Sequence, residues 1–335
     1  MRAIQRVDPT AWARLGLFVA VFLVFSWRDD RFFTTNNVFT IFEGFAFLGL
    51  AALAVGVTII AGELDLSVGS AAAVSGIIAV SLVDEIGLIP TVIVAIVIGT
   101  AYGGLQGYLI YRLRIQSLVF TLGTLIGLRG LAFMISGENT VVMSDLSIAQ
   151  SVRRQIWIFS PFSLVTLGCF VAVALLLVNT RFGREIYAVG GGRQEAAAAG
   201  VPLVRPLVLA FALSGAMAAL TGALTSIKSG SAGPAAFETL LLPAATAALI
   251  GGVSLLGGRG SVFGIAVGAL TLRFINSGLS LGGAPFYILT LATGIVLIVA
   301  VVLELLIGRP ELRARWRRWR TERGMGLRPS SHPAG

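Results

Sequence analysis

The sequence is dominated by a series of apolar runs, each close to the length that crosses a lipid bilayer. A transmembrane helix needs about 20 mainly apolar residues, within a range of about 17 to 25. By that measure we expect about ten crossings, approximately Trp12–Trp27, Phe39–Ala61, Val68–Val83, Pro90–Tyr111, Leu118–Ile135, Phe162–Val178, Pro206–Ile227, Leu240–Leu256, Val262–Ile275 and Phe286–Ile307. Continuous runs of this kind indicate helices rather than the alternating strands of an outer-membrane barrel.

The composition excludes a soluble domain. Of the 335 residues, 56% are hydrophobic and only 12% are charged, and the mean hydropathy is +0.91. A single soluble core of this size cannot cover so much apolar surface, so most of it must face lipid or other helices. We therefore predict an all-α integral membrane protein, with Trp12–Trp27 as its first span because no signal-peptide cleavage site follows it.

The basic residues predict the orientation of the chain. With both termini in the cytoplasm, most of the 25 Lys and Arg residues lie on the cytoplasmic side, as the positive-inside rule requires. We expect a cytoplasmic N-terminus at 1–11 and a transmembrane domain at 12–307, which contains a polar cytoplasmic segment at 180–205. A basic cytoplasmic tail follows at 308–335.

The tail interleaves arginines with Trp316 and Trp319. A nucleic-acid-binding arm is one interpretation of this pattern. The favoured interpretation is a juxtamembrane segment whose arginines contact anionic lipid and whose tryptophans lie at headgroup depth. We thus expect membrane lipid as a partner and no nucleic acid.

Three polar, glycine-rich stretches interrupt the apolar runs, at residues 62–70, 257–261 and 183–200. In the first, Glu63 and Asp65 occupy a helix break, and Ser67 is a candidate N-cap for the next helix. Two carboxylates without further oxygen ligands are a weak signal for a metal ion. A shaped, re-entrant turn is the preferred interpretation.

The stretch at 183–200 predicts a short cytoplasmic helix. Residues 194–199 are strong helix formers, Gly200 is expected to end the helix, and Pro202 prevents its continuation. An ordinary inner loop is the alternative. A compact helix of small side chains is suited to a groove on a cytoplasmic partner.

Several polar residues fall inside expected spans: Glu43, Arg129, Arg273, Asn276 and Glu304. A charged side chain at a helix centre costs about 2.5–3.5 kcal/mol on insertion scales. It therefore needs a partnered or watery environment, either as part of a solute path or as a clamp between helices. For Arg129 the clamp is the favoured of the two interpretations.

The residue inventory argues against catalysis. A phosphate-binding loop needs a lysine after glycine, whereas the only lysine is in Ile227-Lys228-Ser229. A zinc or Ser-His protease needs histidine in the membrane domain, whereas the only histidine is His332. We predict no catalytic residues, no metal site and no cofactor.

Five ordered motifs carry a family resemblance over about 37–306. They are Asp65-Leu66-Ser67-Val68-Gly69-Ser70, Thr121-Leu122-Gly123-Thr124 with Arg129-Gly130, Gly183 to Gly191 with Glu195-Ala196-Ala197 and Gly200, Ile250-Gly251-Gly252 with Gly257 to Ser261, and Asn276-Ser277-Gly278-Leu279. With these motifs the chain resembles the permease subunits of ATP-binding-cassette (ABC) importers, in the ribose, xylose and autoinducer type of sugar permease. Glu63, Gly192 and Arg273 depart from the family pattern.

The resemblance implies a permease of about ten helices in the bacterial inner membrane. It implies three partners: a second permease copy or paralogue, cytoplasmic ATPase subunits, and a periplasmic solute-binding protein. Coupling to the ATPase is expected at Gly183, Arg184, Glu185, Glu195, Ala196, Ala197 and Gly200. The candidates for the pathway or its gate are Glu43, Asp65, Ser67, Thr121, Arg129 and Asn276.

The expected function is therefore ATP-driven import of a sugar or related polar solute. A permease for nucleosides or branched-chain amino acids is an alternative. An ion-driven secondary transporter is less favoured. Such proteins usually place carboxylates at the membrane midplane, whereas acidic residues within the expected spans are scarce here.

Overall fold

The computed structural model describes the backbone of residues 9–308 and the side chains of residues 14–302. Within this part the chain forms thirteen helices and one pair of two-residue strands. In chain order these are α1 (Pro9–Arg28), α2 (Thr35–Ile60), α3 (Val68–Ile86), α4 (Leu88–Leu113), α5 (Ser117–Ser136), β1 (Val141–Val142), α6 (Leu146–Arg153), α7 (Pro161–Asn179), α8 (Arg181–Gly191), α9 (Arg193–Ala198), α10 (Val204–Ser229), β2 (Ser231–Ala232), α11 (Leu241–Ile250), α12 (Val262–Leu281) and α13 (Phe286–Gly308).

The predicted class, an all-α membrane protein with several passes, is confirmed. Among the described residues, seven helices are long and apolar enough to cross a membrane, namely α2, α3, α4, α5, α7, α10 and α12. Helices α1 and α13 coincide with the first and last crossings expected from the sequence. The strands β1 and β2 pair antiparallel, with Val141 opposite Ala232.

The eighth expected crossing, Leu240–Leu256, differs from the prediction. Only Leu241–Ile250 is helical there, a length of 10 residues. At about 1.5 Å per residue this covers about half of a hydrocarbon core of about 30 Å. Residues 233–240, which precede this helix, form no regular helix or strand. Irregular backbone at membrane depth is tolerated only where protein buries it or water reaches it.

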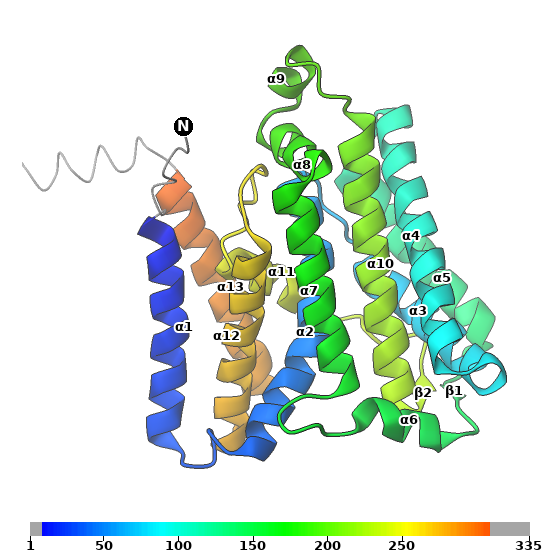
Figure 1. The fold of residues 1–335 in the computed structure, drawn as a ribbon, viewed down its shortest axis with the longest axis vertical. Coiled ribbons are helices and arrows are strands. Elements are labelled where there is room, and N and C mark those ends of the chain that lie inside the picture. Colours follow the sequence, from blue (N-terminus) through cyan, green and yellow to red (C-terminus); the bar gives the residue numbers. More distant parts are fainter. Residues whose placement is uncertain (1–8, 309–335) are drawn as a thin grey trace, which may run out of the picture.

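The two ends of the bundle carry different features. Helices α8 and α9 lie at one end, together with the start of α1 and the end of α13 (Figure 1). The strands and α6 lie at the opposite end. This arrangement agrees with the expectation that the two termini and the polar segment at 180–205 lie on the same side of the membrane. The predicted N-terminal segment up to residue 8 and the basic tail after residue 308 lie outside the described residues.

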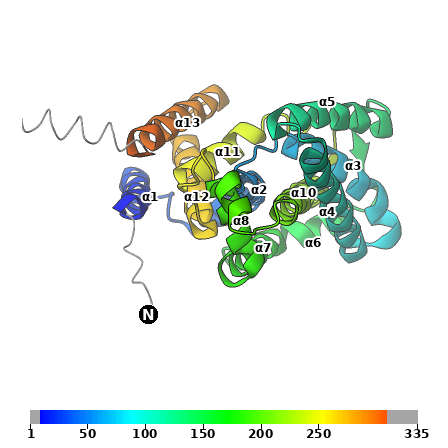
Figure 2. The same cartoon turned by 90° about the horizontal axis from the view of Figure 1, so that it is seen from above.

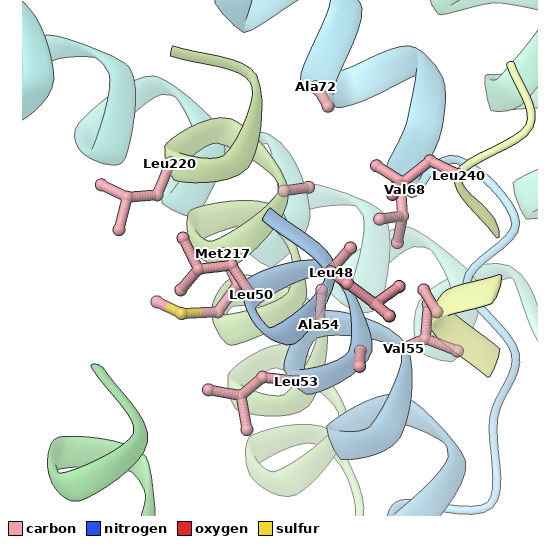
Figure 3. Close-up of a cluster of buried hydrophobic side chains, with 14 of the residues drawn as sticks. Leu48, Leu50, Leu53, Ala54, Val55, Val68, Ala72, Met217, Leu220 and Leu240 are labelled. Carbon is pink, nitrogen blue, oxygen red and sulfur yellow. The ribbon is translucent and has the colours of Figure 1, made fainter. Parts of the chain in front are cut away.

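Helix α2 forms the centre of the fold. It packs against α10, α11, α12 and α7, and the view along the bundle shows it between them (Figure 2). Its buried side chains include Leu50 and Leu53, which belong to the same buried cluster as Met217 of α10 (Figure 3). A helix that is apolar on all sides is typical of such a central position.

The tightest helix pair joins α4 to α10 through glycines. Gly99, Gly103 and Gly107 of α4 recur every fourth residue and face the backbone of α10. A Cβ added at Gly103 would overlap the carbonyl oxygen of Phe211. Small residues at this spacing let two membrane helices approach closely, so that van der Waals packing holds them together.

Candidate functional site: a glycine junction beneath a polar helix pair

The structure brings the three polar stretches of the sequence into contact at one end of the bundle. The backbone N–H of Gly258 donates to the carbonyl oxygen of Ile60 over 2.9 Å. Gly190 packs between them, and a Cβ there would overlap the Ile60 carbonyl oxygen and approach the Gly258 nitrogen. A Cβ on Gly257 would meet Gly62 and Gly190. We call these residues, Gly62, Gly190, Gly257 and Gly258, the glycine junction.

The end of α2 places Gly62 in this junction. The N–H of Gly62 bonds to the carbonyl of Ile59, and the N–H of Glu63 bonds to that of Thr58, each over 2.9 Å. This pair of bonds is a Schellman motif, which needs a left-handed residue at its centre. Gly62 supplies it with φ +78°. The motif also fixes the position of Glu63, the first residue beyond Gly62.

The polar segment at 183–200 forms two helices rather than one. Helix α8 was not predicted; it begins with Thr180 as N-cap and ends at the glycine junction. Helix α9, Arg193–Ala198, matches the predicted short helix within a residue at each end. Gly200 ends it as expected, with φ +80°. Helix α9 projects beyond α8 at the end of the bundle (Figure 1).

The coupling candidates divide between these two helices. Gly183 is buried against the Leu177 carbonyl, and Ala196 is buried in α9. Glu185 is half-buried, and its Oε2 has no hydrogen-bond partner among the described residues. The exposed candidates are Arg184, Glu195, Ala197 and Gly200.

An ion pair joins α9 to the turn between α2 and α3. Arg193, the first residue of α9, pairs with Glu63, whose side chain is 5% exposed. Burial lowers the pKa of Arg193 from its ordinary value. A cavity of about 370 Å³ opens beside the pair and is also lined by Gln116, Ser117 and Leu255.

Tyr187 of α8 provides a further tie. Its hydroxyl donates to the Gly260 carbonyl oxygen over 2.9 Å, and burial raises the pKa of this phenol. The phenol therefore stays a hydrogen-bond donor at physiological pH. It links α8 to the loop before α12, on the same side as the glycine junction.

Asp65 is the centre of a buried polar network in the α2–α3 turn, which we define as residues 61–67. Its carboxylate accepts from the Ser67 backbone N–H at 3.0 Å and the Ser67 hydroxyl at 2.6 Å. Gln106 of α4 donates to it at 3.2 Å, and Ser214 of α10 at 2.7 Å. One carboxylate thus holds the turn to two spans.

Ser67 and Thr121 belong to the same network. Ser67 occupies the N-cap position of α3, but its side chain makes no capping bond. The expected capping role is therefore wrong, because the hydroxyl donates to Asp65 instead. Thr121 of α5 donates to the Leu64 carbonyl oxygen at 3.1 Å, so α5 is tied to the turn as well.

Glu43 lies apart from this network. It forms an ion pair with Lys228 at the end of α10 and accepts a hydrogen bond from Ser160, the N-cap of α7. The side chains of Glu43 and Lys228 are 9% and 28% exposed. This geometry is that of a clamp between three helices, one of the two interpretations open for a charge inside a span.

Arg129 forms an ion pair with Glu238 of the irregular stretch before α11. Its side chain is 18% exposed, whereas that of Glu238 is 56% exposed. The pair therefore joins α5 to the irregular stretch, with the guanidinium largely covered and the carboxylate largely exposed.

The last pathway candidate, Asn276, lies on α12 one turn from Arg273. The Asn276 Oδ1 and the Arg273 Nε are buried, and neither has a hydrogen-bond partner among the described residues. The Arg273 guanidinium packs against Gly44 of α2. Thus Asp65, Ser67 and Thr121 gather at one turn, and the other three candidates are separate.

Sequence reasoning missed several functional partners. Gln106, Ser214 and Tyr102 complete the Asp65 network, while Lys228 and Glu238 neutralise charged candidates. A glutamine within an expected span was a usable signal for Gln106. Single serines and tyrosines in apolar runs give no comparable signal.

The fold and site define a multi-pass membrane protein with a polar helix pair presented at one end. Residues 37–303 match the family model described as branched-chain amino acid transport system / permease component. The ribose import permease protein of Escherichia coli K12 is 30% identical over 90% of this chain and 96% of its own length. That of Bacillus subtilis is 32% identical over 87% and 91%. The D-allose transport system permease protein of Escherichia coli is 30% identical over 89% and 93%.

The chain belongs to this family of ABC transporter permeases. The family resemblance predicted from the motifs is thus confirmed, over nearly the same residues. No solved structure matches the chain.

Proposed function

We propose that this chain is the permease subunit of an ATP-driven ABC importer for a sugar or a chemically related polar solute. The relatives named for ribose and allose support the sugar class. An L-arabinose ABC transporter permease protein from Azospirillum brasilense is a further relative named for a sugar. These relatives match most of both chains, which supports a shared function.

The observation that carries the coupling role is the glycine junction. It joins α8 to the end of the central helix α2 and to the loop before α12 by backbone contacts. A displacement of α9 and its neighbour α8 is therefore transmitted to α2 and to the loop before α12. This is the arrangement that a chain needs if ATP hydrolysis on a partner is to move its spans.

The pathway is proposed to run along α5 and the irregular stretch before α11. The exposed Glu238 and its partner Arg129 border this face. Because charged groups and irregular backbone avoid lipid, a second permease copy or paralogue is expected to face them across a watery path. The chain would work in the bacterial inner membrane, with a periplasmic solute-binding protein and two cytoplasmic ATPase subunits as partners.

A second candidate is import of branched-chain amino acids, because the family description names that class. The two are separated by uptake into proteoliposomes that contain the permease with its ATPase and solute-binding protein. Labelled ribose, allose and arabinose are compared with labelled leucine. Accumulation of leucine but of no sugar would contradict the sugar assignment.

The energy source is tested in the same vesicles. We expect vanadate, which traps ABC ATPases, to abolish uptake, whereas an ionophore that dissipates proton and sodium gradients leaves it unchanged. The reverse pattern would show an ion-driven secondary transporter instead.

The coupling role predicts a specific effect of breaking α9. The N–H of Ala196 donates to the Gly192 carbonyl at 2.9 Å, so Ala196→Pro removes a helix bond and adds a ring at a buried position. We expect ATP-dependent uptake to fall by at least about tenfold, equivalent to about 1.4 kcal/mol of coupling, with normal membrane insertion. Glu195→Pro is milder, because Glu195 lies in the first turn where proline replaces an unpaired N–H.

The matched control is Glu195→Ala, which removes the charge but keeps the helix. We expect it to retain uptake, since at this position the backbone shape of α9, rather than the charge of Glu195, is proposed to matter. Equal uptake in Ala196→Pro and the parent protein would refute the coupling role of α9.

A further inference from the structure

We propose that the Glu63–Arg193 ion pair is the link that transmits the movement of α9 to the α2–α3 turn during transport. The inference rests on the proposed function, in which an ATPase displaces α9. It adds two positioning residues, neither of which was among the coupling or pathway candidates. It also gives the buried Asp65 network a route to the cytoplasmic surface.

The first step of the argument is the position of α9. This helix has only six residues, and within the described chain it packs mainly on α8. The Glu63–Arg193 pair joins it directly to a different part of the bundle, 130 positions earlier in the sequence. A displacement of α9 must therefore act on this pair.

The second step is the unequal exposure of the two charges. About half of the Arg193 side chain is exposed, so its guanidinium keeps access to water when α9 moves. The carboxylate of Glu63 is nearly buried, so water in the neighbouring cavity can replace its partner only in part. Separating the pair leaves a buried charge unpaired, which is costly, so the turn is driven to follow Arg193.

The third step is what the turn holds. The Schellman motif fixes Glu63 to the end of α2. Two residues later, Asp65 is bonded to Gln106 of α4 and Ser214 of α10. Thr121 of α5 holds the Leu64 carbonyl between them. A pull on Glu63 thus acts on four spans, including α5, which borders the proposed pathway.

The test measures how many solute molecules are imported per ATP hydrolysed, in proteoliposomes that contain the complete transporter. We expect Glu63→Gln and Arg193→Gln each to lower this ratio by at least about fivefold, the lower end of typical coupling effects, while ATP hydrolysis continues. The reversed pair, Glu63→Arg with Arg193→Glu, should recover at least half of the ratio. Arg205→Gln, on the same side of the bundle, is the matched control and should leave the ratio unchanged.

A covalent link provides a second measurement if the reversed pair does not fold. Glu63→Cys and Arg193→Cys are introduced together in a Cys169→Ser background and joined by a short thiol crosslinker. Because the two groups are proposed to move as a unit, the crosslinked protein should keep at least half of its uptake. Arrest of uptake by the crosslink would show that α9 and the turn separate during transport, and would overturn the proposal.

The two levels of the argument fail in different ways. If Glu63→Gln and Arg193→Gln keep the parent ratio while Ala196→Pro uncouples transport, α9 is the coupling helix but the ion pair is not its link. If Ala196→Pro also transports normally, the coupling role itself is refuted. A loss of uptake and hydrolysis together in Glu63→Gln also contradicts the proposal, since it indicates a defect in assembly.

Discussion

Gly190→Ala is expected to abolish transport and to lower the free energy of unfolding by about 2–3 kcal/mol, in the range of overpacked interiors. The added methyl group would overlap the carbonyl oxygen of Ile60 and crowd the Gly258 nitrogen. Both are backbone atoms, which cannot move aside as the end of a flexible side chain can. The end of α8 must then separate from α2, and the glycine junction opens.

The neighbouring residue is a matched control for this prediction. Gly191 belongs to the same helix, but a Cβ there meets nothing within 4 Å. Alanine is favoured over glycine inside a helix by about 1 kcal/mol, so Gly191→Ala should be neutral or slightly stabilising.

Thermal unfolding in detergent and uptake in proteoliposomes measure the two effects separately. If Gly190→Ala behaves like Gly191→Ala in both assays, the close backbone contact at the junction is not required. If Gly190→Ala is stable but inactive, the junction serves coupling more than folding. Both results are informative because the two substitutions are chemically identical.

Lys228→Met is expected to destabilise the folded protein by about 2 kcal/mol, less than the 3–5 kcal/mol typical of a fully buried pair. The substitution leaves the Glu43 carboxylate without its cation, at a side chain that is 9% exposed. The reduced magnitude reflects Lys228, which is 28% exposed and so retains part of its hydration. Thermal unfolding in lipid nanodiscs gives the measurement.

Two companion variants separate the charge from the packing of Lys228, which also lies 5.9 Å from the Phe162 ring. Lys228→Arg keeps the charge and should stay within about 1 kcal/mol of the parent. Lys228→Met combined with Glu43→Gln removes both charges and should recover most of the loss, because no unpaired ion remains. A double variant as unstable as Lys228→Met would contradict the clamp and leave packing as the cause.

The class of protein and most of its spans could be predicted from the sequence, because a lipid environment imposes a length and a composition on each crossing. The residues around Leu241 show the limit of that reasoning. Their apolar run extends well past Ile250, but the helix ends there. Hydropathy measures the apolar character of a stretch and does not distinguish a complete span from a short helix flanked by irregular backbone.

In the candidate site, too, local features could be predicted from the sequence, whereas the partners of its charged residues could not. The turn chemistry of Gly200 and the polar character of residues 62–70 are local properties, and the sequence contains them. The partners of Glu43, Arg129 and Glu63 lie more than 100 positions away along the chain. No feature of the sequence around Glu43 or Lys228 identifies Lys228, rather than another basic residue, as the partner of Glu43.

The sequence by itself thus determined that this chain crosses a membrane repeatedly, which family it belongs to, and where its polar breaks fall. These follow from hydrophobicity and backbone chemistry, which act over a few neighbouring residues. Only the tertiary structure decided that the three glycine-rich stretches touch and that α9 is tied to a buried glutamate. Such contacts depend on how helices pack, and close packing is a property of pairs of surfaces rather than of any single segment.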